Sequence, residues 1–214
     1  MNVQSVSSHA FFDDEPADTR AAIMQATYRA FCEHGYAGLT IQRIGDEFPK
    51  SKSLLYHHYD GKDALLVEFL SFMLRRFEAT MPDREYEDAR DQLTAIFDHT
   101  LPRDPAPERA QFRAAMVELR AQATTNEAYR THFTRNDRFF RERFAAVVRR
   151  GIEEGVFREV DPDRIAAMVV ATIHGAMQEE ATTNGAESAH VREELRAYVR
   201  SQLLAENVTP ETVG

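Results

Sequence analysis

The chain has 214 residues and a formal net charge of −9, with 26 Lys and Arg against 35 Asp and Glu. This length fits one or two small domains, and the acidic balance excludes a basic surface that covers the whole protein. The single cysteine, Cys32, excludes an intrachain disulfide and a cysteine metal cluster. The basic residues are uneven: 23 are arginine, and the three lysines, Lys50, Lys52 and Lys62, lie within a stretch of thirteen residues.

The N-terminal residues carry no recognisable targeting signal. Residues 1–15 are polar with an acidic end and are predicted to form a disordered tail. They lack the basic and apolar regions of a signal peptide, and no apolar run in the chain reaches the length of about 18 residues that a membrane helix needs. We therefore expect a cytoplasmic protein without membrane contact. The preference for acids and arginine suits a high-salt cytoplasm or a GC-rich genome, and composition does not separate the two.

Helical spacing of apolar residues begins early in the chain. It predicts a first helix that starts near Pro16, since proline is tolerated in a first turn, and that ends at Gly35, where a left-handed backbone costs least. Thr40 is the predicted N-cap of a short second helix, Thr40–Phe48, which Pro49 ends.

A third short helix and a longer fourth helix follow. Ser51 is the expected cap of the third helix, Ser51–His58. Asp60-Gly61 is a turn pair, and apolar residues at helical spacing predict a fourth helix from Lys62 to about Thr80. Two short helices joined by a tight turn are a candidate helix-turn-helix, whose second helix is short enough to enter a DNA major groove about 12 Å wide.

The rest of the chain is also helical in pattern, with a boundary near residue 80. Gly155 is a stop signal and Asp161-Pro162 a restart signal, because aspartate caps a helix and proline suits its first turn. No alternating strand pattern occurs, so the predicted fold class is all-α with about nine helices. The later helices are expected over about residues 86–101, 112–119, 127–154, 161–181 and 188–204.

The candidate helix-turn-helix has the side chains that DNA binding needs. Lysine, arginine, hydroxyls and helix N-terminal amides bind DNA phosphates. Residues 19–62 hold six basic and four acidic residues, whereas residues 81–214 hold 18 basic and 24 acidic ones, so the acidity is segregated from this segment. The candidate DNA contacts are Thr40, Arg43, Lys50, Ser51, Lys52, Ser53, Tyr56, His57 and Lys62. Each could instead be a solvated surface residue, and Tyr56 could be a half-buried core residue.

The run from Arg20 to Leu66 resembles the TetR/AcrR family of transcriptional regulators. The resemblance depends on Phe31, Gly35-Tyr36, Leu39-Thr40, Ile44-Gly45, Ser51-Lys52-Ser53, Leu55-Tyr56-His57-His58-Tyr59 and Lys62-Asp63-Ala64-Leu65-Leu66. The family's usual turn reads Ala-Gly-Val-Ser, whereas this chain has Phe48-Pro49-Lys50-Ser51. Because proline cannot take the positive φ of the turn glycine, we expect a locally different turn, with Lys50 directed toward DNA or solvent.

The resemblance implies roles for individual residues. Phosphate contacts are expected from Thr40, Tyr56 and Lys62, and Lys62 would share a phosphate with the first amides of the fourth helix. Lys52 is the expected base reader, because lysine can hydrogen-bond guanine O6 and N7. The residues implied to face the groove are Lys52, Ser53 and His57.

The resemblance also implies a domain organisation. Residues 16–62 would be an N-terminal three-helix helix-turn-helix domain, 63–80 a connecting helix, and 81–214 a helical-bundle domain for ligand binding and dimerisation. The helices at about 161–181 and 188–204 would form the homodimer interface. The two helix-turn-helix domains of the dimer, about 34–36 Å apart, would then meet successive major grooves of a palindromic operator in double-stranded DNA.

The implied mechanism is a repressor that a small apolar effector of unknown identity releases from its operator, by shifting the population toward a state with a moved fourth helix. An aromatic and methionine-rich pocket suits such a ligand. The candidate pocket residues are Phe97, Phe112, Met116, Phe139, Phe140, Phe144, His174 and Met177. Each of them also fits an ordinary helix-bundle core, and His174 also fits a hydrogen-bonded interior histidine.

Two other functions are compatible with the sequence. A helical protein–protein adaptor without DNA binding is favoured by Pro49 and by the net charge of −9. An all-helical metalloenzyme would need two ligand pairs and two further carboxylates, and only Glu187 and His190 have the spacing of such a pair. Cys32 near His34 is a poor metal site. No phosphate-binding loop or nucleophile elbow is present, so no catalytic residue, metal or cofactor is predicted and an enzyme is not expected.

Overall fold

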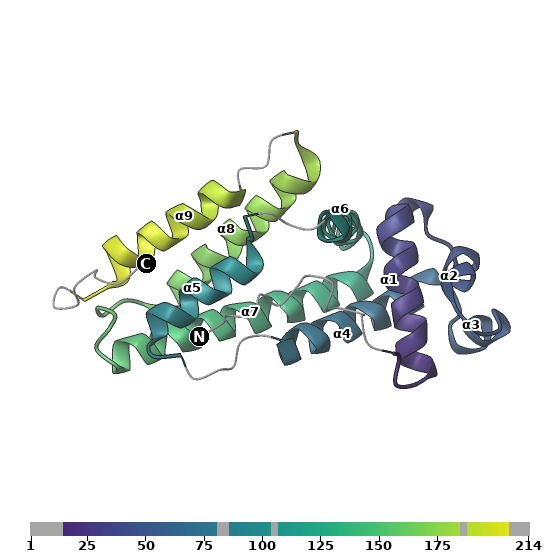
Figure 1. Cartoon of the computed structure of the whole chain (residues 1–214), viewed down its shortest axis with the longest axis horizontal. Coiled ribbons are helices and arrows are strands. Elements are labelled where there is room, and N and C mark those ends of the chain that lie inside the picture. The colour runs from purple at the N-terminus through teal and green to yellow at the C-terminus, as the bar shows by residue number, and fades with distance from the viewer. Residues whose placement is uncertain (1–14, 81–85, 104–106, 185–187, 206–214) are drawn as a thin grey trace. The chain divides into compact units, whose positions relative to one another are not determined.

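The computed structural model describes residues 15–80, 86–103, 107–184 and 188–205. Over these ranges the chain forms nine α-helices and one π-helical turn (Figure 1), and its extended pairing is limited to an isolated bridge between Phe157 and Leu204. The predicted all-α class is therefore confirmed. Of the predicted tail at residues 1–15, only Glu15 falls within the described ranges.

The described residues divide into two compact units. The first unit, here called the N-terminal unit, contains residues up to Thr80 together with 107–133. The second, the C-terminal unit, contains 86–103 and the residues from Thr134 onward. The predicted division at residues 62 and 80 stays a prediction, but residues 107–133 were not expected to pack with the helix-turn-helix.

Helix α1, Thr19–Gly38, opens the N-terminal unit. The Asp18 carboxylate accepts a hydrogen bond of 2.7 Å from the Ala21 N–H, which is the usual N-cap contact. The predicted start near Pro16 was therefore too early. Gly35 has a φ of 62°, as predicted for a left-handed residue, but it kinks α1 and the helix continues to Gly38.

Helices α2, Ile41–Glu47, and α3, Ser53–His58, form the short pair that the sequence predicts. The Thr40 cap is confirmed, because its Oγ1 accepts a hydrogen bond of 3.1 Å from the Arg43 N–H. The Ser51 cap is also present. Ser51 Oγ accepts a hydrogen bond of 3.4 Å from the Ser53 N–H, and Lys52 already has helical φ and ψ, so the first turn begins directly after Ser51.

The core of the N-terminal unit joins α1 to two later helices. These are α4, Lys62–Thr80, and α6, Pro107–Gln122. The Phe31 ring lies edge-on to Phe69 of α4 at 5.9 Å and to Phe112 of α6 at 6.4 Å, and Tyr28 lies 5.2 Å from Phe112. Aromatic side chains of this size dominate the burial energy of a core. Helix α6 is thus part of the support for α1, on which the predicted helix-turn-helix packs.

The C-terminal unit is also built from helices with clear caps. Helix α5, Ala89–Thr100, starts after an Asp88 cap rather than at residue 86. The restart at Asp161 is confirmed, because its carboxylate accepts hydrogen bonds from two amides at the start of α8, Pro162–Thr182. The unit is completed by the residues of α7, Glu127–Glu153, from Thr134 onward, by α9, Ser188–Tyr198, and by the π-helical turn Val199–Leu203.

Candidate nucleic-acid interface

The α2–α3 pair has a buried side and an exposed side. Ile44 and Leu55 are fully buried, and Phe48 is 5% exposed, so three apolar side chains anchor the pair to the core of the N-terminal unit. The opposite side carries polar and charged residues. A short helix fixed in this way can present its outer face to a groove without rearranging.

The structure places the predicted DNA contacts on this outer side. Tyr56 is 63% exposed, so the alternative of a half-buried core tyrosine is wrong. Lys62 at the start of α4 is partly buried. The exposed members of the set are Thr40, Arg43, Lys50, Ser51, Lys52, Ser53, Tyr56 and His57. Their DNA-binding roles stay predictions.

The turn between α2 and α3 tolerates proline without a left-handed residue. Phe48, which precedes Pro49, has extended φ and ψ of −89° and 124°, the conformation that a following proline favours. Its N–H donates to the Gly45 carbonyl at 3.4 Å. Within the described residues, the glycines with positive φ are Gly35 and Gly155, and neither lies in this turn.

Three predicted contacts have partners inside the protein. The Lys52 ammonium forms an ion pair with Asp46 of α2. The Arg43 guanidinium donates to the Gly38 carbonyl. The Lys50 Nζ donates to Thr19 Oγ1 at 2.9 Å. Sequence reasoning did not identify these partners, since each lies on the other side of a turn or on another helix.

Lys62 contacts both the backbone carbonyl and the ring of Tyr36. Its Nζ donates to the Tyr36 carbonyl at 3.0 Å and lies 4.1 Å from the centroid of the Tyr36 ring. A cation over an aromatic face gains electrostatic attraction. An ammonium has three N–H donors, so Lys62 can keep this contact and still donate to a phosphate.

A hydrogen-bonded cluster around Tyr36 joins α1 to three other helices. The Glu118 carboxylate of α6 accepts from the Tyr36 N–H at 2.7 Å. Asp63 of α4 accepts from the hydroxyls of Tyr36 at 3.2 Å and of Tyr129, on α7, at 2.7 Å. Burial first, and then Asp63, raises the pKa of Tyr129 well above its usual range, so this hydroxyl stays a donor. A side chain at Gly35 would place its Cβ 2.9 Å from the Glu118 carboxylate.

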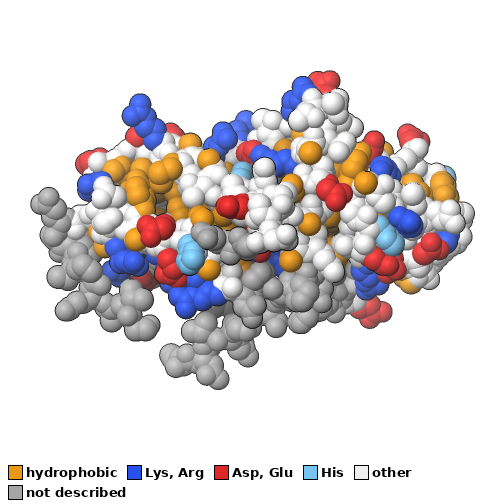
Figure 2. Space-filling view, turned by 90° about the horizontal axis from the view of Figure 1, so that it is seen from above, with side chains coloured by type: hydrophobic (Ala, Val, Ile, Leu, Met, Phe, Trp, Pro, Cys, Tyr) orange, Lys and Arg blue, Asp and Glu red, His pale blue; other side chains and the backbone are white. Residues whose placement is uncertain are grey.

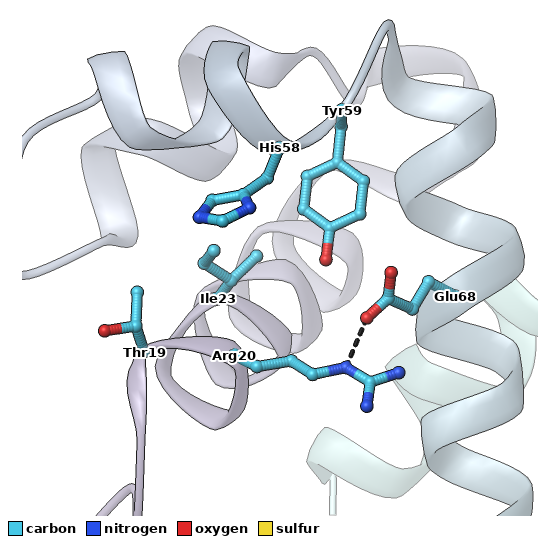
Figure 3. Close-up of a pocket in the computed structure, with 6 residues that line it drawn as sticks. All are labelled: Thr19, Arg20, Ile23, His58, Tyr59 and Glu68. Carbon is cyan, nitrogen blue, oxygen red and sulfur yellow. Dashed lines mark hydrogen bonds and ion pairs between the residues drawn. The ribbon is translucent and has the colours of Figure 1, made fainter.

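A depression of about 210 Å³ lies behind α3 (Figure 3). It was not predicted from the sequence. Its walls hold the Arg20–Glu68 ion pair between α1 and α4, with the Tyr59 hydroxyl nearby. Burial first, and then the Glu68 charge, raises the pKa of Tyr59 to about 12. The complete lining is Thr19, Arg20, Ile23, His58, Tyr59 and Glu68. The two charges in its lining, Arg20 and Glu68, pair with each other and join α1 to α4.

The predicted pocket residues divide between the two units. Phe112 and Met116 pack against the core of the N-terminal unit. In the C-terminal unit, the rings of Phe97 and Phe144 stack at 6.2 Å, and those of Phe139 and Phe140 meet edge-on at 5.4 Å. The partly buried residues of α8 in the set are His174 and Met177. The effector pocket as a whole stays a prediction.

Two further features of the described residues concern the metalloenzyme alternative and contact with a membrane. In the described part of the chain, no three His, Cys, Asp or Glu side chains are arranged to hold a metal ion. Of the ligand pair considered above, Glu187 lies outside the described residues. No described helix is long and apolar enough to cross a membrane. Figure 2 shows acidic and basic side chains interspersed over the visible face, in agreement with the sequence argument against a single large basic surface.

Comparison with known proteins decides the family. Residues 23–69 match the model of bacterial regulatory proteins of the tetR family. Residues 89–204, more than half of the chain, match the C-terminal domain of BetI-type transcriptional repressors. The chain belongs to the TetR family of transcriptional regulators. It is therefore a DNA-binding, ligand-responsive repressor, and the adaptor and metalloenzyme alternatives are not favoured. Proteins of this family are generally not enzymes.

Individual relatives agree with this assignment. A TetR transcription regulator from Haloarcula marismortui is 38% identical, with a TM-score of 0.79, over 87% of this chain and 98% of that one. The repressor AcnR of Corynebacterium efficiens is 25% identical over 75% of this chain and 80% of that protein. A regulator from Saccharomonospora viridis, solved in complex with choline, shares the fold with a TM-score of 0.75 at 22% identity, covering 87% of this chain and 97% of that one.

Proposed function

We propose that this TetR-family chain is a homodimeric repressor that binds a palindromic operator through α2 and α3 and that a small apolar effector releases. The observation that supports this most is the geometry of α3. Its exposed face carries Ser53, Tyr56 and His57, while Leu55 on the opposite side is fully buried. A helix anchored on one side and polar on the other suits insertion into a major groove.

The phosphate contacts would come from residues at helix starts. Thr40 Oγ1 accepts the Arg43 N–H, and its hydroxyl proton remains able to donate to a phosphate oxygen. Tyr56 at the exposed side of α3 and Lys62 at the start of α4 would flank the groove. Contacts of this kind set the register of the protein on DNA and contribute affinity that depends on salt.

The homodimer would form through α8 and α9, which run side by side (Figure 1). On α8, Ala167, Ala171 and Gly175 are exposed and repeat every four residues, beside Met168, which is 40% exposed. Small residues at this spacing allow a second helix to approach closely, and an exposed apolar side chain favours a covering partner. An Ala171→Arg variant should sediment as a monomer and lose operator binding.

The effector response would reach the DNA-binding helices through two elements. The fourth helix was expected to carry it, and within the N-terminal unit α6 would move together with α1, because Glu118 accepts the Tyr36 N–H. An effector bound among the aromatic side chains of the C-terminal unit would favour a state in which these helices change the spacing of the two helix-turn-helix domains. Choline is a reasonable first compound for a screen, since aromatic side chains bind quaternary ammonium groups.

The deciding experiment is a mobility shift on the DNA upstream of the protein's own gene, at several salt concentrations. The proposal expects binding to a palindrome, with an affinity that falls as salt rises. A screen of apolar compounds and choline should then find one that lowers the affinity. Absence of any sequence-selective binding would contradict the operator assignment, and an affinity unchanged across the screen would remove the effector part alone.

A further inference from the structure

The three lysines of the helix-turn-helix differ in the charge of their partners. Lys50 donates to a hydroxyl and Lys62 to a backbone carbonyl, both of which are neutral acceptors. Lys52 instead pairs with the Asp46 carboxylate, and in the described part of the chain it is the one lysine in an ion pair. Both side chains are well exposed, at 45% for Lys52 and 58% for Asp46, so this ion pair lies on the outer side of the two helices α2 and α3.

The path of the Lys52 side chain to Asp46 depends on a glycine. Gly45 is buried in α2, and a Cβ added there would lie 2.8 Å from Lys52 Cγ and 3.0 Å from Lys52 Cδ. The shorter of these distances is one that real Cβ atoms essentially never show, so a side chain at position 45 would require the Lys52 stem to shift. The aliphatic stem of Lys52 thus lies directly on the α2 backbone, and two consecutive α2 residues determine where its ammonium goes.

We propose that Asp46 is a specificity-determining residue of the DNA-binding site, and this inference rests on the proposed function. Lys52 has three N–H donors. While one of them stays with Asp46, the other two can reach a neutral base edge such as guanine O6 and N7. A phosphate in the same place would bring a second anion against the Asp46 carboxylate. Asp46 therefore makes Lys52 a reader of base edges and a poor binder of phosphates.

This arrangement has a consequence for binding to unrelated DNA. Non-specific affinity comes from lysine and arginine charges that release counterions from phosphates, with a salt slope of about 0.9 for each phosphate neutralised. A lysine already neutralised by a carboxylate contributes little to this release. Lys52 is thereby withheld from non-specific binding, and its charge does not weaken the discrimination between an operator and other sequences.

The test compares two duplexes of equal length: a site selected by the wild-type protein from a random DNA pool, and an unrelated sequence. For Asp46→Asn we expect about threefold tighter binding to the unrelated duplex, the size of effect typical of one released surface ion pair. Its salt slope should steepen by up to about 0.9, and the ratio of specific to non-specific affinity should fall. Asp60→Asn is the control, since it removes one exposed acid of the same segment that has no ion pair with Lys52.

A second variant, Gly45→Ala, tests the same ion pair without changing the net charge. The added methyl should displace the Lys52 stem from α2 and separate the Lys52 ammonium from Asp46. It should therefore lower the specificity ratio as Asp46→Asn does. Adding Lys52→Ala to either variant should remove the effect, because the displaced ammonium is then absent. Circular dichroism and thermal melting check that each variant is folded.

The outcomes separate this inference from the proposed function. If wild-type protein selects a site but Asp46→Asn changes binding no more than Asp60→Asn does, the role of Asp46 is overturned while the repressor assignment stands. The role of Asp46 is also overturned if the Asp46→Asn effect persists in the Lys52→Ala background. If the wild-type protein selects no site at all, the operator assignment fails and the inference fails with it.

Discussion

The lysines of the N-terminal unit and the arginines of the C-terminal unit hold their partners in different ways. Each lysine of the helix-turn-helix contacts one or two acceptors at an exposed or partly exposed position. Arg192 of α9 is 3% exposed and donates both to the Leu101 carbonyl at 3.1 Å and to Glu193 at 2.9 Å, with Asp98 at 3.7 Å. The members of this α5–α9 network are Asp98, Arg103, Arg192, Glu193 and Arg196.

The difference follows from the chemistry of the two side chains. A guanidinium presents five donors in a rigid plane and suits several fixed acceptors, whereas an ammonium is a compact charge on a flexible stem that exchanges partners readily. The buried Arg192 therefore suits a fixed network within the fold, and the ammonium groups of the helix-turn-helix suit the proposed contacts with DNA.

Arg192→Ala should have the largest effect on stability, and it tests whether the buried arginine contacts stabilise the fold. It removes the buried hydrogen bond to the Leu101 carbonyl, while the exposed carboxylates of Asp98 and Glu193 keep Arg196 and Arg103 as partners. We expect the free energy of unfolding to fall by about 2–3 kcal/mol, the scale of a lost hydrogen bond from a charged group, as measured by urea denaturation. Arg103→Ala, at a side chain that is 73% exposed, is the matched control and should cost far less. Equal losses in the two variants would contradict the distinction.

Lys52→Ala should leave the fold intact and change DNA recognition. We expect a loss of about 1–3 kcal/mol of discrimination at one operator position, the value of a base contact with two hydrogen bonds, in binding assays with single-base operator variants. The free energy of unfolding should change by less than about 0.5 kcal/mol, as for most surface substitutions. An unchanged base preference would remove Lys52 from the reading residues.

Tyr129→Phe tests whether the hydrogen bonds around Asp63 stabilise the N-terminal unit. The buried hydroxyl donates to Asp63 at 2.7 Å, and its loss should cost about 1 kcal/mol of unfolding free energy. Tyr56→Phe is the control, because that hydroxyl is exposed and should matter for DNA affinity only. A Tyr129→Phe protein as stable as the wild type would indicate that this bond contributes nothing.

Lys62→Ala should weaken all DNA sequences about equally. Loss of one phosphate contact reduces the salt slope by about 0.9, which a titration of binding against salt concentration measures. The variant also loses the contact of Lys62 with Tyr36, so thermal melting is needed to separate folding from binding. A loss confined to the operator would instead assign Lys62 to base reading.

The pairing of Glu193 with Arg192 and Arg103 should make the free energy of unfolding depend on pH. Hydrogen bonds from Arg192 and then from Arg103 lower the pKa of Glu193 to about 2, from an ordinary value of 4.5. A lowered folded-state pKa stabilises the protein above the unfolded value, and this contribution is lost as the pH falls from about 4.5 toward 2. In urea denaturation, Glu193→Gln should be less stable than wild type at pH 7 and close to it near pH 2. A constant difference over this range would contradict the assignment.

The sequence predicted those parts of the fold that depend on neighbouring residues. The caps at Thr40 and Asp161 and the break at Gly155 are local signals, and the structure has all three. The starts at Pro16 and at residue 86 were too early, because a capping aspartate slightly further along the chain sets the first turn in each case. Local signals also could not show that α6 packs on α1.

The candidate site was predictable in composition but not in its internal contacts. The sequence indicated that Tyr56 and Lys52 would face outward, and both are exposed. It did not indicate that Lys52 pairs with Asp46 or that Glu118 accepts the Tyr36 N–H across 82 positions. Such contacts depend on how elements pack, and polar residues that hold each other in place leave no periodic trace in the sequence.

The position of α6 limits where this regulator can be truncated. In an N-terminal fragment that ends after α4, Phe31 would lose its contact with the Phe112 ring, and the Tyr36 N–H would lose its acceptor, the Glu118 carboxylate. Such a fragment would expose apolar surface and would be prone to aggregate. A chimera that joins the helix-turn-helix to another sensor must therefore carry residues 107–133 as well as the residues up to Thr80.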